Sequence, residues 1–351
     1  MSSTATPGQG PGLQIRNNLA SDYADIYTPA ALDALGHMSQ YNNEQKRLMD
    51  ERTKRRLTRM RDHQPVGFLP ADGEIKGTGI RVQDARDGNF VGAVIPHDLQ
   101  RQWLQGTGPA AKPNSPVQAN LRNVAYALLS GADGWMFDVE DALGQITTLS
   151  LDNQRSLTLA VARAPQFLEV AEAGSQEMNA WARDFFGREI IADWRKQLDF
   201  TTKIFRARGL HLDDRHIRLD GQSFSASITD MTLYVVNNYK ALQDDGSSIV
   251  LYLPKIQTAE EAGFWNKLLS ALENYLGLDE GTIKVYVLGE QLEATFQLME
   301  IRAALGLHFV GFNTGRWDYI NSVSDSNCWD PVFINPNIES IVMTYSDSRN
   351  Y

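Results

Sequence analysis

The sequence predicts an α/β protein built on a TIM (β/α)8-type barrel that is incomplete at its C-terminal end. Short apolar segments alternate with amphipathic helical segments from about residue 116 onward. Strands that are apolar on both faces and alternate with helices are typical of parallel βαβ units. The sequence has no Gly-x-Gly-x-x-Gly fingerprint after the first predicted strand and no Gly-x4-Gly-Lys loop. A barrel is therefore favoured over a nucleotide-binding doubly wound sheet.

The chain before the barrel is predicted to form a flexible tail (residues 1–25) and a helical arm that wraps the barrel (26–115). Thr28-Pro29 places a capping residue before a proline at the first helical position, so we expect a helix to begin there. A long polar helix is expected over Asn43–His63, and its basic run, Lys54–Arg61, is interpreted as a solvated helix face.

The barrel domain is predicted over residues 116–351, with its first strand at Gly134–Val139. Thr258 and Glu261 form a capping-box pattern at the start of one barrel helix. The later strands are expected at Thr202–Ala207, Ser248–Pro254, Ile283–Gly289, Phe309–Asn313 and Ser340–Thr344. The helices are expected at 117–130, 229–243, 258–276 and 291–305.

The composition of the chain indicates a globular protein and argues against several other classes. The 351 residues are 42% hydrophobic and 22% charged, as in a globular protein with a sizeable core. A net charge of −10 argues against nucleic acid as the main partner. Cys328 is the only cysteine, which excludes a disulfide framework and a thiolate zinc site within one chain. No run approaches the roughly 18 apolar residues of a membrane span, and the first residues lack the apolar core of a signal peptide. We expect a cytoplasmic protein without a membrane partner.

Charged side chains follow five successive predicted strands. Because active groups of a parallel barrel gather at the C-terminal ends of its strands, we expect these side chains to meet at one place. The residues concerned are Asp138, Glu140, Asp141, Arg206, Lys255, Glu290 and Asp318.

These residue types suit one kind of chemistry. Carboxylates without histidine or cysteine form an oxygen site of the kind that Mg²⁺ prefers. Mg²⁺ leaves positions that a 2-oxo acid can chelate, and Arg206 would stabilise negative charge that develops on oxygen. Backbone amides of Gly315–Asp318 could bind a carboxylate, as helix starts do. The set predicts a site that polarises a 2-oxo acid toward attack by a carbanion.

Each group taken alone has another interpretation. Glu290 could be an ordinary helix N-cap, and Arg206 a buried ion-pair partner. His211 and His216 could form a metal pair, although we prefer a surface turn because the spacing of the histidines matches no zinc site.

Five segments resemble blocks of the malate synthase family in its A-type form. The Arg-Trp-Asp-Tyr and Leu-Pro-Lys blocks are specific in combination, and the similarity runs from about Ile26 to the C-terminus. The segments begin at Gly131 ("GADGWMFDVEDA"), Arg206 ("RARGLHLDD"), Tyr252 ("YLPK"), Gly281 ("GTIKVYVLGE") and Gly311 ("GFNTGRWDYI").

The resemblance implies an acyltransferase that condenses acetyl-CoA with glyoxylate to malyl-CoA and hydrolyses it to malate and CoA. It implies that Glu290 and Asp318 hold Mg²⁺ and that Arg206 is the catalytic arginine. The groups expected to hold the glyoxylate carboxylate are Gly315, Arg316, Trp317 and Asp318. The residues expected around metal-bound water are Asp138, Glu140 and Asp141, with Lys255 beside them.

The sequence also departs from the family. Family members add further barrel strands and a helical C-terminal domain that supplies an aspartate base and much of the CoA pocket. The sequence therefore resembles a shortened member, a split or truncated enzyme whose base comes from a partner chain. The alternatives are a noncatalytic homologue or partner-binding subunit, and a 3-hydroxyacyl-CoA lyase. Glu293 replaces a family proline and is expected to crowd the metal, while Trp317 and Tyr319 are expected to wall and pack the loop.

Overall fold

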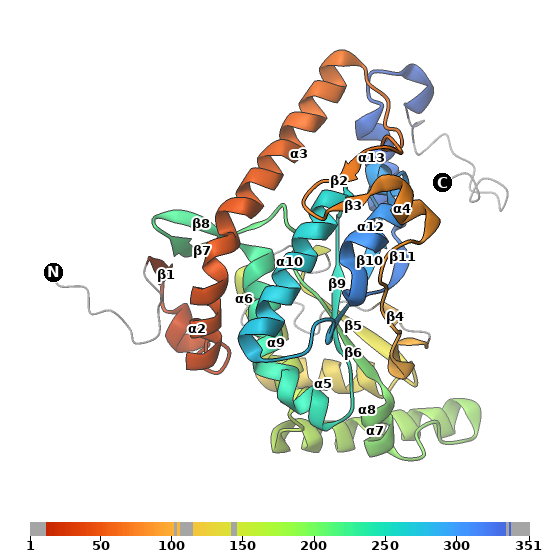
Figure 1. Ribbon diagram of the computed structural model, residues 1–351. Helices are drawn as coiled ribbons and strands as arrows, with labels where there is room; N and C mark the ends of the chain where they lie inside the picture. The colour runs from red at the N-terminus through yellow and green to blue at the C-terminus, as the bar shows by residue number, and fades with distance from the viewer. Residues whose placement is uncertain (1–11, 102–103, 106–114, 142–145, 335–336, 338–351) are drawn as a thin grey trace.

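A parallel sheet forms the centre of the computed structural model, which describes residues 12–101, 104–105, 115–141, 146–334 and 337 (Figure 1). Within these residues the sheet has six strands in the order β11-β10-β9-β6-β5-β4, and every pairing is parallel. The strands are β4 (Leu104–Gln105), β5 (Gly134–Asp138), β6 (Thr202–Arg206), β9 (Ile249–Leu253), β10 (Ile283–Gly289) and β11 (Phe309–Thr314).

The strand order follows the order of the chain, as expected for a barrel wound in one direction. Among the described residues, β4 and β11 are not paired with each other, so the barrel is open. The predicted fold class, an incomplete TIM-type barrel, is confirmed. The interior is filled by a small apolar cluster from the inward faces of the strands and from Leu99, which precedes β4. Its members are Leu99, Met136, Ile204, Val250, Tyr252, Tyr286, Leu288 and Val310.

Helices between the strands cover the outside of the sheet with a larger apolar core, in which Trp265 is fully buried. No helix in the described part of the chain has both the length and the apolar character needed to cross a membrane. The helices are α5 (Val117–Leu128), α6 (Thr147–Val161), α7 (Pro165–Phe186), α8 (Trp194–Phe200), α9 (Ala226–Asp244), α10 (Ala259–Leu276), α11 (Leu292–Thr295), α12 (Leu298–Leu305) and α13 (Arg316–Ser326). Short 3-10 turns are η1 (Ser39–Tyr41), η2 (His97–Leu99), η4 (Gly306–His308) and η5 (Pro331–Phe333).

Several barrel elements differ from the sequence-based expectations. β4 precedes the predicted first strand and lies within the segment assigned to the arm. The helix expected over 291–305 is divided into α11 and α12, and α6 to α8 were not predicted. Thr258 caps α10 as expected, but the Glu261 carboxylate accepts from the amide of Gln257 instead of Thr258. The strand expected at Ser340–Thr344 lies outside the described residues.

The start of the described chain packs against a β-hairpin. The hairpin consists of β7 (Asp213–Leu219) and β8 (Gln222–Ser225), and β1 (Leu13–Ile15) pairs antiparallel with β7. The short helix α1 (Leu19–Asp22) follows β1 along the chain. Because Leu13 is buried, the later part of the predicted flexible tail is ordered. His216 lies within β7, so the surface turn expected for it is wrong.

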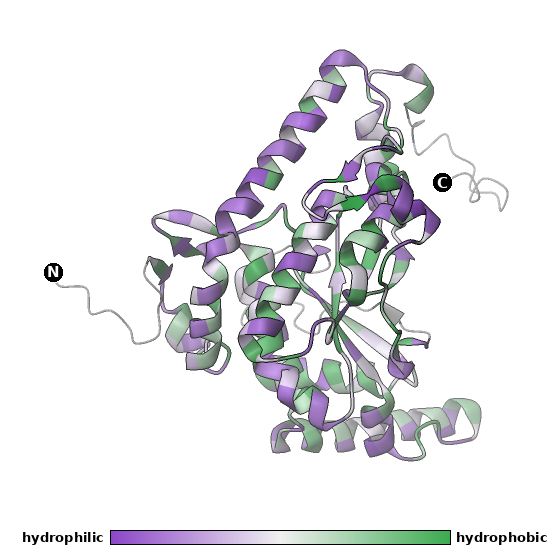
Figure 2. Ribbon diagram, viewed as in Figure 1, coloured by the Kyte–Doolittle hydropathy of each residue, from purple (hydrophilic) through white to green (hydrophobic). Residues whose placement is uncertain are grey.

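A helical arm precedes the barrel. α2 (Pro29–Met38) begins at the cap Thr28, as predicted, and α3 (Asn42–Asp62) runs past the hairpin to α13 (Figure 1). Figure 2 shows that α3 is hydrophilic over most of its length. The solvated face predicted for its basic run is wrong in part, because Arg59 is buried and pairs with Glu293. The arm continues through β2 (Glu74–Ile75), β3 (Ile80–Arg81) and α4 (Val82–Asp87).

A buried ion cluster forms around Arg208, two residues after the end of β6. Arg208 is fully buried, and its Nε and Nη2 donate at 2.8 Å to the two carboxylate oxygens of Asp230 on α9. Nη2 also donates to Asp214 at 2.9 Å. Because Arg208 is two residues from Arg206, this cluster fixes the backbone that leaves the strand.

We expect Asp230→Ala to destabilise the protein strongly, because it leaves a buried guanidinium with one carboxylate instead of two. The free energy of unfolding should fall by about 3–5 kcal/mol, measured by urea denaturation. Asp193→Ala, which removes an exposed helix cap at α8, is the matched control and should lower it by about 1 kcal/mol. Equal losses in the two variants would contradict a special role of this cluster.

Candidate active site

The charged residues predicted at strand ends lie together at one end of the sheet. Asp138 and Arg206 are the last residues of β5 and β6, and Glu290 directly follows β10. Lys255 lies two residues beyond β9, and Asp318 lies in the first turn of α13. Each comes from a different strand end, so the parallel sheet itself brings them within contact distance.

Arg206 is buried at the centre of this group. Its Nη1 donates to Asp138 at 3.1 Å, and its Nη2 donates to Glu140 and, at 3.0 Å, to Asp141. Nη2 also lies 3.8 Å from Oε1 of Glu290. Burial disfavours the charged guanidinium, but these carboxylates outweigh that effect and hold the pKa of Arg206 above its usual range.

Lys255 contacts the site carboxylates through both its backbone amide and its side-chain ammonium. Its backbone amide donates to Oε1 of Glu290 at 2.8 Å. Its ammonium lies 2.5 Å from Asp141, 3.2 Å from Glu140 and 3.3 Å from Asp318. Burial opposes the charge on Lys255, yet these contacts raise its pKa. A single residue therefore contacts four of the site carboxylates.

Three carboxylates are placed to hold a cation. One oxygen each from Asp141, Glu290 and Asp318 can lie within 4.8 Å of the others. Glu290 is buried, whereas Asp141 is 41% exposed and Asp318 29% exposed at their side chains, so one side of the group is open to solvent. An all-oxygen set of this kind fits Mg²⁺. Asp141, expected only to surround metal-bound water, thus joins the two expected ligands.

Burial and neighbouring charges shift the pKa values of these acids in different directions. Burial raises the pKa of Glu290 to about 8, against the opposing effect of Lys255 and with support from Asp318. Burial also raises the pKa of Glu140 and of Asp138, although Arg206 acts against it in both cases. For Asp141 the effect of burial is outweighed by the Lys255 ammonium, and the pKa is lowered.

The turn between β11 and α13 differs in detail from the expected carboxylate-binding loop. The amide of Gly315 donates to the carbonyl of Gly289 at 3.2 Å and is therefore already used. α13 begins at Arg316 without a side-chain cap, so the amides of its first turn carry the anion-binding character of a helix N-terminus. The amide of Gly315 is thus already engaged, and the carboxylate-binding role of residues 315–318 stays a prediction.

Gly315 has another function in this turn, which is to permit close packing. A Cβ at this position would lie 2.7 Å from Cβ and 3.1 Å from Oε2 of Glu290. Its φ of −105° is open to any residue, so space and not backbone conformation requires glycine here. The expectation that Trp317 walls the loop is wrong, because its side chain is 75% exposed and stacks under the guanidinium of Arg316.

Two residues that were not predicted to belong to the site lie near it, and one of them is His211, which was expected in a surface turn. His211 is 29% exposed, and its Nε2 lies 3.8 Å from Glu140. Burial, with Arg52 and Lys255 nearby, lowers its pKa to about 4, so this histidine is neutral near pH 7. Arg52 of α3 donates to the carbonyl of Lys255 at 2.9 Å. Arg52 lies just before the basic run Lys54–Arg61, and no motif in the sequence marked it.

Glu293 does not crowd the metal group as expected. Its Oε1 pairs with Nη1 of Arg59 at 2.6 Å, and this contact turns the carboxylate toward α3. The departure from the family at this position therefore forms a link between the barrel and the arm.

The fold and the site define a TIM-barrel protein with an acidic, arginine-centred group at the C-terminal ends of its strands. Residues 202–351 match the family description "Malate synthase, TIM barrel domain". The chain is 31% identical over 320 residues to a malate synthase of Myxococcus xanthus, covering 91% of this chain and 52% of that protein. It is 30% identical to malate synthase A of Escherichia coli, covering 83% of this chain and 51% of that protein.

A bifunctional glyoxylate cycle protein of Caenorhabditis elegans is 35% identical over 265 residues, which are 76% of this chain and 25% of that protein. The chain belongs to the malate synthase family, and its residues 202–351 correspond to the TIM-barrel domain. It spans about half the length of the curated malate synthases that it matches.

We expect metal binding to depend on pH through Glu290. Its raised pKa, about 8, keeps the metal-free carboxyl protonated at pH 7, whereas a metal ligand must be ionised. Binding of Mg²⁺ should therefore release a proton near pH 7, and the affinity should rise about tenfold per pH unit up to pH 8. Calorimetry in two buffers of different ionisation enthalpy measures the proton release. An affinity that stays constant between pH 6 and 8 would contradict the prediction.

We expect Gly315→Ala to disturb the site through Glu290. The added Cβ cannot be accommodated without moving Glu290, so the free energy of unfolding should fall by about 1–3 kcal/mol. Affinity for Mn²⁺ should fall in the same variant. The matched control is Gly67→Ala, where a Cβ meets nothing within 4 Å. A Gly315→Ala protein that unfolds like the control and binds Mn²⁺ normally would rule out the packing argument.

Proposed function

We propose that the chain carries the electrophile-binding half of a malate-synthase-type reaction, a Mg²⁺-dependent condensation of acetyl-CoA or a related acyl-CoA with glyoxylate or another 2-oxo acid. The observation that supports this most directly is the placement of Asp141, Glu290 and Asp318 beside buried Arg206. The cytoplasmic location predicted from the sequence stays part of the proposal.

The carboxylates Glu290 and Asp318, with Asp141, would hold the metal. Bound Mg²⁺ would supply a Lewis acid that polarises the carbonyl group of the 2-oxo acid. Lys255 would keep these carboxylates close together, because its ammonium contacts Asp141 and Asp318 and its amide contacts Glu290.

Arg206 is proposed to stabilise the oxygen that gains charge. Its Nη atoms are engaged by carboxylates, but its buried Nε has no hydrogen-bond partner among the described residues. A buried donor without a partner is unfavourable unless an acceptor arrives, and a substrate oxygen would satisfy it. A donor held rigidly in this way needs no reorganisation as charge develops.

The first amides of α13 are proposed to bind the carboxylate of the 2-oxo acid. They lie next to Asp318, at the positive end of the helix dipole. Arg316 and Trp317 are exposed at this turn and would flank the carboxylate.

The reaction also needs a base that removes a proton from the acyl methyl group. The resulting carbanion forms the new carbon–carbon bond at the 2-oxo carbon, whose oxygen then takes up a proton. Water hydrolyses the thioester and releases CoA. We propose that this base comes from outside the described residues, on further sequence or on a partner chain.

The test is release of CoA thiol from acetyl-CoA that depends on both glyoxylate and Mg²⁺, with the chain alone and with polypeptides encoded beside it. Arg206→Lys should lower kcat by about 10²–10³, and Asp318→Asn should raise the Mg²⁺ requirement. Lys196→Ala changes an exposed residue of α8 and should leave both values unchanged.

The other outcomes identify the alternatives. Binding of glyoxylate with Mg²⁺ but no turnover under any combination indicates a noncatalytic homologue. Cleavage of a 3-hydroxyacyl-CoA without condensation indicates a lyase. Absence of both metal-dependent binding and turnover rejects the proposed function.

A further inference from the structure

Four arginines of α3 form a row along the face that meets the barrel. Arg52 is three and four residues from Arg55 and Arg56, and these are four and three residues from Arg59, so the set lies on one side of the helix. We call this set the arginine row; its members are Arg52, Arg55, Arg56 and Arg59. Each contacts a segment that follows a strand bearing a site residue.

The row reaches three strand ends. Arg55 donates to Gln257 at 3.1 Å in the segment after β9, and Arg59 pairs with Glu293 after β10. Arg56 donates through Nε to Asp325 of α13 at 2.7 Å, after β11. These segments are the ones that carry Lys255, Glu290 and Asp318.

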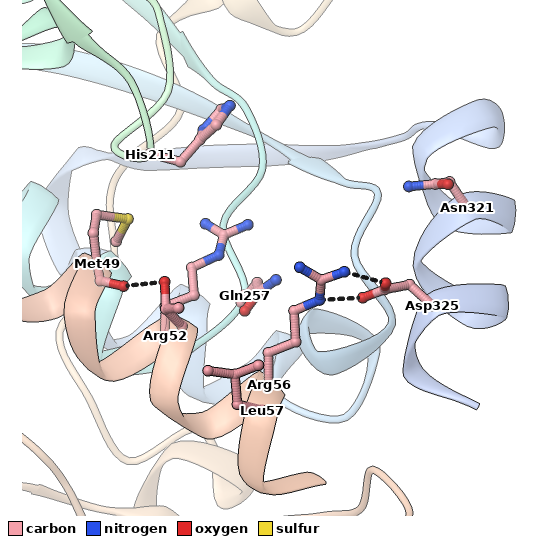
Figure 3. Close-up of a pocket in the computed structure, with 9 residues that line it drawn as sticks. Met49, Arg52, Arg56, Leu57, His211, Gln257, Asn321 and Asp325 are labelled. Carbon is pink, nitrogen blue, oxygen red and sulfur yellow. Dashed lines mark hydrogen bonds and ion pairs between the residues drawn. The ribbon is translucent and has the colours of Figure 1, made fainter. Parts of the chain in front are cut away.

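A cavity of about 400 Å³ lies at these contacts. Figure 3 shows Arg52 and Arg56 extending from α3 among the residues that line it. His211 and Gln257 lie on the barrel side of Arg52, and a pair of dashed lines joins Arg56 to Asp325. The row is thus part of a polar junction that adjoins the site, and its members are not simply solvated.

Arg52 contacts the most constrained residue of this junction. Its Nη1 donates to the carbonyl of Lys255 at 2.9 Å. Lys255 has φ +53°, a left-handed conformation that L residues rarely adopt unless their surroundings impose it. The buried carboxylate of Glu261, 3.7 Å from Arg52, helps to orient the guanidinium.

The conformation of Lys255 fixes where its amide points. That amide donates to Oε1 of Glu290 at 2.8 Å, which orients the carboxylate proposed to bind metal. A continuous path therefore runs from Arg52 to the carbonyl of Lys255, through its left-handed backbone to its amide, and on to Glu290. Hydrogen bonds that orient a metal-ligating side chain, made by groups that do not themselves touch the metal, commonly determine the metal affinity.

We propose that Arg52 is a positioning residue for the metal site, acting through the left-handed turn at Lys255 on the orientation of Glu290. The inference deepens the proposed function and rests on it for the identity of the site. A lysine could donate to the same carbonyl, but its flexible ammonium lacks the rigid guanidinium plane of Arg52, whose Nη1 lies near both the Lys255 carbonyl and Glu261. Arg52→Lys should therefore retain part of the effect that Arg52→Ala loses.

The test uses the full chain and two readouts that do not need turnover. In the metal-free protein, hydrogen exchange of the amides in residues 253–258 should be at least about tenfold faster in Arg52→Ala, because the turn at Lys255 opens more often. Mn²⁺ affinity, measured by electron paramagnetic resonance, should fall about 10–100-fold. Arg52→Lys should lie between the wild type and Arg52→Ala in both readouts.

Arg47→Ala is the matched control. Arg47 lies on the same helix, and its partners Glu51 and Glu260 are outside the site, so both readouts should stay within about twofold of the wild type. Thermal unfolding of all variants separates a local effect from a global one. Local exchange and Mn²⁺ affinity should change in Arg52→Lys even if Arg52→Ala unfolds.

The outcomes for the two proposals are distinct. If the wild type binds no Mn²⁺ and shows no turnover, the proposed function fails, while exchange at 253–258 still tests whether Arg52 holds the turn. If the wild type binds Mn²⁺ and both Arg52 variants match it in affinity and exchange, the positioning role is overturned. Equal changes in Arg47→Ala would also overturn it, because the effect would then belong to α3 as a whole.

Discussion

The balance between buried carboxylates and two cations is the interaction on which this site depends. Asp138 and Glu140 are both buried at one end of the sheet, where isolated negative charges would be strongly unfavourable. Arg206 and Lys255 make that arrangement stable, and they come from neighbouring strands. The parallel strands bring these side chains together at one end of the sheet, and the two cations offset the free-energy cost of burying the carboxylates.

The location of the site could be predicted from the sequence because it follows from periodicity. Once apolar strands and helices alternate, the residue after each strand must lie on a common edge, and Glu290 and Asp318 were found in this way. β4 was missed because its two residues carry no periodic signal. The division between α11 and α12 was missed because the apolar pattern continues through it.

The remaining features depend on contacts between distant residues, which a pattern in one segment cannot reveal. The basic run of α3 has the composition of a solvated face, and only the fold places Asp325 and Glu293 opposite it. The amide of Gly315 looked available because its partner, the carbonyl of Gly289, belongs to another strand end. Residue type indicated which groups belong to the candidate site. Only the tertiary structure shows which of them are already hydrogen-bonded or ion-paired to another part of the protein.

The link between Arg52 and Lys255 joins residues 203 positions apart in the chain. Contacts at such separation form only after the intervening chain has been brought together, and their loop-closure entropy makes them slow to form. The strands can pair with their neighbours in the order of synthesis, but the left-handed turn gains its support from α3 only when the arm docks on the assembled sheet. We therefore expect the site to acquire its final geometry in a step that is separate from pairing of the strands and that depends on docking of α3.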